Sequence, residues 1–252
     1  MTNKYTVDLN CDMGESFGPW AMGDDKAILP YVSSVNIACG FHAGDPSTMM
    51  RTLQLAAAYP IRIGAHPGFQ DLLGFGRREI QVTPREVYEL MVYQIGALAA
   101  CAKTKGLKLQ HVKPHGALYN MAARKRDLAD AIAQAVFDID PGLILFGLSG
   151  SESITAGRGK GLTVYSEVFA DRTYQHDGSL TPRQDADALI HDYRRAAQQV
   201  IRMIKEGKVI SMQGLEVDIQ VDTICLHGDN AEAILFARKI NEQLIAEDIE
   251  IR

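Results

Sequence analysis

The chain has little that would suggest a disulfide framework or a membrane anchor. Its 252 residues include four cysteines, and no two of them form a CxxC pair. Two of the four end apolar, strand-like segments, so we expect buried free thiols and a reducing compartment. No apolar run approaches the roughly 18 to 20 residues that span a bilayer, and residues 1–8 do not read as a signal peptide. These absences predict a cytoplasmic protein that binds no membrane.

Excess positive charge and the common nucleotide and nucleophile motifs are also missing. The formal net charge is -5, and nucleic-acid binding relies on clustered Lys and Arg, so a small-molecule partner fits better than nucleic acid. No GxGxxG follows a predicted strand, and no GxSxG elbow is present. Residues 157–161, Gly-Arg-Gly-Lys-Gly, lack the spacing of a phosphate loop and are predicted to form a tight basic turn.

What the chain does contain is an alternation of short apolar segments with longer helical ones. The hydrophobic share of 46% and the length suit a single α/β domain over residues 1–252. Several apolar segments are continuous, as in parallel strands covered on both faces. The pattern predicts a parallel sheet, either doubly wound or closed into a barrel. The predicted strands are Tyr5–Asn10, Ser34–Cys39, Ile61–His66, Leu107–Val112, Leu143–Leu148, Leu162–Phe169 and Asp222–His227.

Helix signals lie between these strands. The clearest is Thr83-Pro84-Arg85-Glu86, a capping box with proline at the first helical position, whose helix should run to Gly106. Three loops, residues 13–27, 67–78 and 170–181, are long or glycine-rich, which is typical of functional loops. The other predicted helices are Asp45–Ala58, Asp127–Phe137, Pro182–Glu206 and one that starts at Asp229.

Polar side chains follow nearly every predicted strand. In parallel α/β folds the carboxyl ends of the strands meet at one face, so we expect these groups to converge on a ligand site. They are Asp8, Asn10, Asp12 and Glu15, then Asn36 and His42, His66, Lys113 and His115, Glu167, Asp171 and Arg172, and His227 and Asp229. Carboxylates and histidines transfer protons, cationic side chains hold anions, and glycine-rich loops offer backbone donors. This is the inventory for hydrolysing a carbonyl compound.

Other interpretations of the same residues remain open. Asp12, His66 and Asp171 could instead ligate a divalent metal. His111 and His115 have the spacing of a helical zinc site, but Pro114 argues against a helix there, and an extended chain points Lys113 and His115 to one face. Purely structural roles exist for Asp45 and Asp229 as helix caps, for Asp8 as the partner of a buried base, and for His42 and His227 as buried neutral rings.

Seven motifs together resemble the LamB/YcsF lactam-utilisation family. The resemblance runs from Asp8 to Asp229, and one departure follows Arg183, where the family usually reads close to Pro-Gly-Ala-Val-Ile and this chain has residues 185–190, Asp-Ala-Asp-Ala-Leu-Ile. The motifs are Asp8-Leu-Asn-Cys-Asp-Met-Gly-Glu15, Asn36-Ile-Ala-Cys-Gly-Phe-His-Ala-Gly-Asp45, Gly64-Ala-His-Pro-Gly-Phe69, Gly74-Phe-Gly-Arg-Arg78, Val112-Lys-Pro-His-Gly-Ala-Leu-Tyr-Asn120, Glu167-Val-Phe-Ala-Asp-Arg172 and Cys225-Leu-His-Gly-Asp229.

The resemblance implies a distorted seven-stranded β/α barrel, similar to the glycoside hydrolase/deacetylase fold. It also implies ATP-dependent opening of 5-oxo-L-proline to L-glutamate, with Mg²⁺ as the counter-ion of ATP, and two partner subunits, B and C. On this hypothesis Asp12 or Asp171 is the base, His66 and His115 stabilise or protonate, and Lys113 and Arg172 hold an anionic group. The remaining expected substrate-binding residues are Asn10, Asn36, His42, Glu167, His227 and Asp229.

Two further functions stay open at this point. One is a metal-dependent carbohydrate deacetylase, suggested by the implied barrel and its Asp and His groups. The other is a non-catalytic subunit that binds 5-oxoproline and delivers it to partners. Whether the protein itself binds a metal is likewise undecided.

Overall fold

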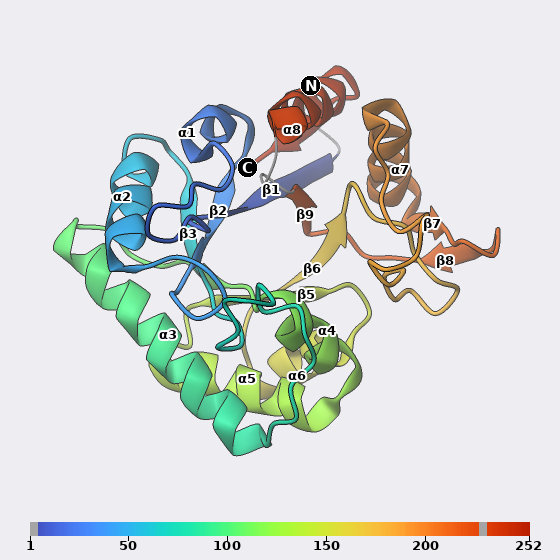
Figure 1. The fold of residues 1–252 in the computed structure, drawn as a ribbon. Helices are drawn as coiled ribbons and strands as arrows, with labels where there is room; N and C mark the ends of the chain where they lie inside the picture. Colours follow the sequence, from blue (N-terminus) through green and yellow to red (C-terminus); the bar gives the residue numbers. More distant parts are fainter. Residues whose placement is uncertain (1–4, 227–230) are drawn as a thin grey trace.

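A closed ring of parallel strands forms the centre of the molecule. The computed structural model describes residues 5–226 and 231–252 (Figure 1). Neighbouring strands pair in the order β1-β2-β3-β4-β5-β6-β9, and β9 also pairs with β1, which closes the ring. The strands are β1 (Tyr5–Met13), β2 (Ser34–Ala38), β3 (Arg62–His66), β4 (His111–Val112), β5 (Ile144–Leu148), β6 (Val164–Phe169) and β9 (Thr223–Leu226). Of the two architectures that fit the sequence, the structure is the seven-stranded barrel.

Helices lie outside this ring (Figure 1). They are α1 (Asp25–Ile28), a 3-10 helix (Leu29–Tyr31), α2 (Pro46–Ala56), α3 (Pro84–Thr104), α4 (Gly116–Arg124), α5 (Arg126–Ile139), α6 (Glu152–Lys160), α7 (Tyr193–Glu206) and α8 (Ala231–Ala246). β10 (Ile249–Ile251) pairs with the first half of β1, and β7 (Lys208–Ile210) forms an antiparallel hairpin with β8 (Glu216–Asp218) beside α7. No helix in the described part of the chain is long and apolar enough to cross a membrane.

Alternation along the strands separates an apolar outside from a polar inside. On β1, Leu9 and Cys11 are fully buried in the hydrophobic core, whereas Asn10 between them and Asp8 and Asp12 on either side are polar. Asn10 bonds Glu167 on β6, which is not a neighbour of β1 in the ring. Such a bond can only run through the barrel interior, and successive side chains of a strand point to opposite faces. The interior is therefore a polar network, and the apolar layer lies between strands and helices.

One interior position shows how tightly this network is packed. A Cβ atom on Gly64 would lie 2.1 Å from His111 Nε2, so only glycine leaves room for the imidazole. The ring stacks on Phe146 with centroids 4.2 Å apart, and Nε2 lies 2.7 Å from Asn36 Oδ1. Burial, together with the charge of Arg62, lowers the pKa of His111 to about 3. His111 is a neutral structural histidine.

The helix boundaries confirm some predictions and correct others. Thr83 and Glu86 form the predicted capping box of α3, and Asp45 caps α2 through Thr48 N. The predicted turn at residues 157–161 is wrong, because residues 157–160 complete α6, which ends at Gly161 with φ 87°. The strand predicted for Leu107–Val112 is reduced to His111–Val112.

The helix predicted for Pro182–Glu206 is wrong in its first half. α7 begins at Tyr193, because the Asp192 carboxylate accepts from Arg194 N. Residues 182–192 instead make successive turns and return to the segment after β6, where Ile190 N donates to Asp171 O.

Candidate active site

A cavity of about 1090 Å³ opens at the carboxyl ends of the barrel strands. Its wall includes Asp12 from β1, His66 from β3, and Lys113 and His115 from the segment after β4. Five arginines also line it, namely Arg77, Arg78, Arg124, Arg172 and Arg183. The cavity thus combines acid-base groups at its base with positive charge around them, which suits an anionic ligand.

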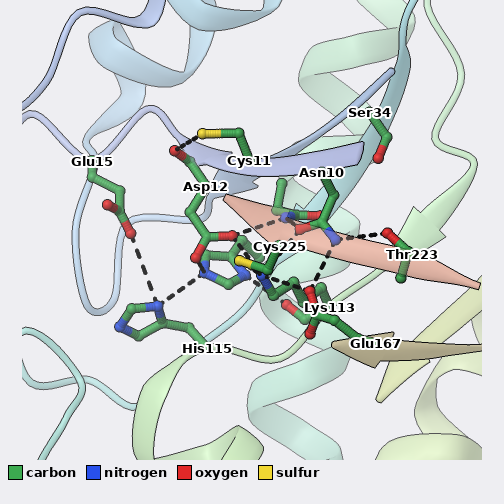
Figure 2. Close-up of polar contacts among 12 residues, drawn as sticks. Asn10, Cys11, Asp12, Glu15, Ser34, Lys113, His115, Glu167, Thr223 and Cys225 are labelled. Atoms are coloured by element: carbon green, nitrogen blue, oxygen red, sulfur yellow. Dashed lines mark hydrogen bonds and ion pairs between the residues drawn. The ribbon is translucent and has the colours of Figure 1, made fainter. Parts of the chain in front are cut away.

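Lys113 is the centre of the polar cluster (Figure 2). Its Nζ lies 2.9 Å from Asp12 Oδ1, 3.0 Å from Glu167 Oε1, 3.0 Å from Cys225 Sγ and 3.2 Å from Asn10 Oδ1. Burial alone would lower the pKa of Lys113, but the charges of Asp12 and Glu167 raise it well above its ordinary value. The side chain is therefore a fixed cation that balances two carboxylates.

A pair of asparagines orients Asp12 from inside the barrel. Asn36 Nδ2 donates to Asp12 Oδ1 at 2.8 Å and to Asn10 Oδ1 at 2.7 Å. Asn10 Nδ2 in turn donates to Glu167 Oε1 at 3.0 Å and to Thr223 Oγ1 at 2.7 Å. Both asparagines and Glu167 are fully buried, so they act on a ligand only through Asp12 and Lys113.

Three histidines stand beside Asp12. His66 Nε2 lies 3.3 Å from Asp12 Oδ2 and 2.9 Å from His115 Nδ1. His42 stacks on His115 with ring centroids 3.7 Å apart. Burial lowers the pKa of His42 and of His115 well below the ordinary value, and the charges of neighbouring histidines add to this. His42 and His115 are therefore neutral at physiological pH.

Glu15 completes this group, although no local pattern distinguished it from the other polar residues after β1. Its Oε1 lies 3.5 Å from His42 Nε2. The same oxygen lies 3.9 Å from His115 Nδ1 (Figure 2). Gly14, with φ 70°, turns the chain between Asp12 and Glu15. The turn at Gly14 places the Glu15 carboxylate at the cavity. This glycine is the feature of the sequence that could have identified Glu15.

The glycine-rich loop 67–78 forms one wall of the histidine group. Gly76 has φ 61°, and a Cβ atom there would lie 2.7 Å from His42 Cβ. The carbonyl of Phe75 lies 2.8 Å from His115 Nε2. Gln94 on α3 holds the start of the loop by bonding both the N–H and the carbonyl of Gly68. The prediction that this loop is functional therefore agrees with its position.

Arg172 and its neighbour Asp171 differ in their position relative to the cavity. Arg172 lines the cavity and donates to the carbonyls of Ala188 and Thr181, which ties down the segment before α7. Burial, with the charge of Arg183, lowers the pKa of Arg172 to about 10, so it remains a cation at neutral pH. Asp171 is not among the residues that line the cavity.

The structure thus sorts the predicted site residues into three groups. Those that line the cavity are Asp12, His66, Lys113, His115 and Arg172; those that lie behind its wall are Asn10, Asn36, His42 and Glu167. Asp171 lies to one side, and His227 and Asp229 fall outside the described residues. The expected catalytic and substrate-binding residues did not include Glu15 or Arg77, and both line the cavity.

The thiols agree with the sequence prediction. All four cysteines are free, and Cys11, Cys39 and Cys225 are buried. Burial raises the pKa of Cys39 to about 12 and that of Cys225 well above its ordinary value. Since the thiolate is the reactive form, neither thiol is prepared to act as a nucleophile.

A closed parallel barrel with its polar cavity at the strand ends is the architecture of the deacetylase-like β/α barrels. A family 4 carbohydrate esterase from Streptomyces lividans shares it with a TM-score of 0.51 at 10% identity, over 99% of this chain and 93% of the esterase, a likeness of fold alone. A family model, LamB/YcsF family, matches residues 7–252. The chain belongs to the LamB/YcsF family.

Two relatives are similar over nearly the whole length. A Bacillus subtilis (strain 168) protein, named as the A subunit of 5-oxoprolinase, is 59% identical over 98% of this chain and 96% of its own length. The structure of a lactam utilization protein from Thermus thermophilus matches with a TM-score of 0.92 at 48% identity, covering 98% of this chain and 99% of that one.

Proposed function

We propose that this chain is the A subunit of an ATP-dependent 5-oxoprolinase, which hydrolyses the cyclic amide of 5-oxo-L-proline to give L-glutamate. The observation that carries the proposal is the 59% identity, over nearly full length, to a protein named as that subunit. On this proposal the chain works in the cytoplasm with subunits B and C and with ATP and its Mg²⁺ counter-ion. The cavity, with acid-base groups and surrounding arginines, is the lactam site.

Coupling to ATP makes chemical sense because a five-membered lactam is a stable amide. Phosphorylation of the carbonyl oxygen turns the ring carbon into a far better electrophile. Water then adds to that carbon, the ring C–N bond breaks, and the nitrogen takes up a proton to become the amine of glutamate, which leaves an acyl phosphate on the opened chain. A second water hydrolyses this acyl phosphate to the glutamate carboxylate and phosphate. The protein must supply a base for the water, a proton for the nitrogen and positive charge for the anions.

Asp12 fits the role of base better than Asp171. Its Oδ1 is held by Lys113 and Asn36, at 2.9 and 2.8 Å, which leaves Oδ2 directed toward His66 at the cavity wall. A base whose position is fixed by two bonds needs little reorganisation during the reaction. Asp171 does not line the cavity.

His66 and His115 are the groups that stabilise the transition state, since both line the cavity beside Asp12 and within hydrogen-bonding distance of each other. We assign the binding of the substrate carboxylate, or of a phosphoryl group, to Arg172 together with the other arginines that line the cavity. Lys113 already stands between two carboxylates, so its main effect is to position Asp12 and balance its charge.

The experiment is to incubate the chain with 5-oxo-L-proline and ATP, alone and with candidate B and C subunits, and to measure glutamate and phosphate together. We expect coupled release of both products only in the mixture. No glutamate in any combination would reject the proposal, and acetate release from N-acetylated sugars would then be the reaction to test.

Variants locate the site within the working mixture. We expect Asp12→Asn and His66→Ala each to lower glutamate formation at least about 100-fold, the usual contribution of a positioned acid or base. Asp130→Asn, on the exposed face of α5, removes a carboxylate that does not line the cavity and should leave the rate unchanged. Full turnover in both Asp12→Asn and His66→Ala would mean that the reaction takes place elsewhere.

A further inference from the structure

The hydrogen bonds of His66 and His115 fix which nitrogen of each ring carries its first proton. His66 Nδ1 lies 2.8 Å from the carbonyl oxygen of Lys113, and His115 Nε2 lies 2.8 Å from that of Phe75. A carbonyl oxygen can only accept, so these two nitrogens are the N–H donors. The lone pairs of the neutral rings are therefore on His66 Nε2 and His115 Nδ1.

These two lone pairs face each other. His66 Nε2 and His115 Nδ1 are 2.9 Å apart, and in the neutral rings neither has a hydrogen to offer the other. Two carboxylate oxygens add negative charge beside these lone pairs. Asp12 Oδ2 lies 3.3 Å from His66 Nε2, and Glu15 Oε1 lies 3.9 Å from His115 Nδ1. Such an arrangement is stable only with a positive species among these atoms.

His42 indicates that the positive species contacts more than the two facing nitrogens of His66 and His115. The ring is buried, and neither of its nitrogens has a hydrogen bond among the residues that the structure describes. Its Nε2 lies 3.5 Å from Glu15 Oε1, the same oxygen that lies near His115 Nδ1. One donor atom from each of Glu15, His42, His66 and His115 lies within 4.8 Å of all the others. A single proton between His66 and His115 would leave His42 unsatisfied, whereas a metal ion can engage all four.

We propose that Glu15, His42, His66 and His115 bind one divalent transition-metal ion at the wall of the cavity. Three imidazoles and one carboxylate suit zinc or a similar borderline ion rather than Mg²⁺, which prefers oxygen ligands. Zinc ligands at about 2.0 to 2.2 Å from the ion lie roughly 3.4 Å apart. The widest donor pair, within 4.8 Å, therefore needs to close by about 1 to 2 Å, and His66 Nε2 and His115 Nδ1, 2.9 Å apart, need to separate slightly.

The surroundings of the rings support ligation. Metal-binding histidines usually donate their second N–H to a backbone carbonyl or carboxylate, which fixes the tautomer. His66 and His115 both do so, through Lys113 O and Phe75 O. The set differs from Asp12, His66 and Asp171, which the sequence suggested: only His66 is common to both, Asp171 does not line the cavity, and Glu15, His42 and His115 join His66 instead.

Metal binding by the isolated chain is the direct test, and it does not depend on the proposed reaction. The untagged chain, freed of metal with a chelator, is titrated with Zn²⁺, Mn²⁺ and Mg²⁺ by isothermal titration calorimetry. We expect about one Zn²⁺ per chain and weak or no binding of Mg²⁺. His115→Gln and Glu15→Gln should each weaken Zn²⁺ binding at least about tenfold.

His176→Gln is the matched control, because His176 is an exposed histidine outside the cluster, and it should bind Zn²⁺ as the native chain does. Melting curves without metal show whether each variant is folded. If a variant does not fold, the visible spectrum of the native chain with Co²⁺ still reports whether nitrogen ligands surround the ion.

Absence of Zn²⁺, Mn²⁺ and Co²⁺ binding would overturn the proposal, as would equal affinity in the native, His115→Gln and Glu15→Gln chains. Histidine ¹⁵N spectra that show one proton shared by His66 and His115 in the metal-free chain, with no metal bound, would identify the positive species as that proton. A chain that binds zinc but yields no glutamate with subunits B and C would keep the metal site and reject the proposed reaction.

Discussion

At the scale of single residues, the barrel interior is organised by charge balance and by hydrogen bonds between buried polar side chains. Lys113 stands between Asp12 and Glu167, and Asp8 is paired with Arg62 at 3.0 Å and with the hydroxyls of Ser33 and Ser34. Buried charges are tolerated only when they are paired and bonded in this way. Asp8 thus pairs with a base, as its structural interpretation predicts, although Arg62 is only partly buried, with its side chain 30% exposed.

His111 gives a pH prediction at this scale. Its pKa is about 3 in the folded protein, against about 6.5 in the unfolded chain. The unfolded state therefore binds more protons below pH 6.5, and stability falls as pH decreases from 6.5 toward 3. The His111 contribution is lost at about 1.4 kcal/mol per pH unit, or about 2 kcal/mol at pH 5.

Urea unfolding at pH 7.5, 6.0 and 5.0 measures this loss. We expect the free energy of unfolding of His111→Gln to fall less than that of the native chain between pH 7.5 and 5.0, by about 2 kcal/mol. His42 and His115 remain in both proteins, so their own losses cancel in the comparison. If the free energy of unfolding falls equally with pH in the two proteins, His111 does not titrate as its burial requires.

At the scale of elements, helix ends depend on single side chains more than on hydrophobic spacing. The apolar residues spaced for a helix begin at Leu189, before the start of α7, but residues 182–192 make turns that return to the segment after β6. Arg172 holds this arrangement by donating to the carbonyls of Ala188 and Thr181. These backbone groups are thus satisfied by a distant arginine instead of by a helix.

The start of α7 is testable with two matched aspartates. Asp192→Ala removes the carboxylate that accepts from Arg194 N, and should lower the free energy of unfolding by about 1 kcal/mol. Asp185→Ala, an exposed change in the segment that was predicted helical, should alter it by less than about 0.5 kcal/mol. Chemical denaturation of both variants measures these free energies of unfolding. A larger loss of unfolding free energy for Asp185→Ala than for Asp192→Ala would favour a helix that begins near Pro182.

At the scale of the whole molecule, the two ends of the described chain are joined. β10 pairs with β1 at Tyr5 and Val7, next to the start of the barrel, and Ile249 is 1% exposed. The last strand therefore covers the first without belonging to the closed ring. Its contribution to stability comes from burial more than from barrel closure.

A pair of isoleucines tests this contribution. Ile249→Ala should lower the free energy of unfolding by about 2 to 5 kcal/mol, the usual loss for a buried isoleucine. Ile245→Ala, at an exposed position of α8, should change it by less than about 0.5 kcal/mol. Thermal unfolding gives both values, and similar melting temperatures for the two variants would show that β10 is not packed as described.

Much of the architecture could be predicted from local patterns. Continuous apolar segments predicted each strand of the ring, and the capping box at Thr83 predicted the start of α3. β10 and the β7–β8 hairpin were missed, because strands of three residues carry too short a pattern to distinguish from loops.

The sequence by itself determined which polar residues follow the strands and, through the family motifs, the barrel they belong to. Only the tertiary structure decided which of them meet, because side-chain direction depends on strand register and on how the ring closes. It turned Asn10, Asn36 and Glu167 into a buried support for Asp12 and Lys113. It also brought Glu15 and His42, which belong to separate loops, to the same few ångströms as His66 and His115.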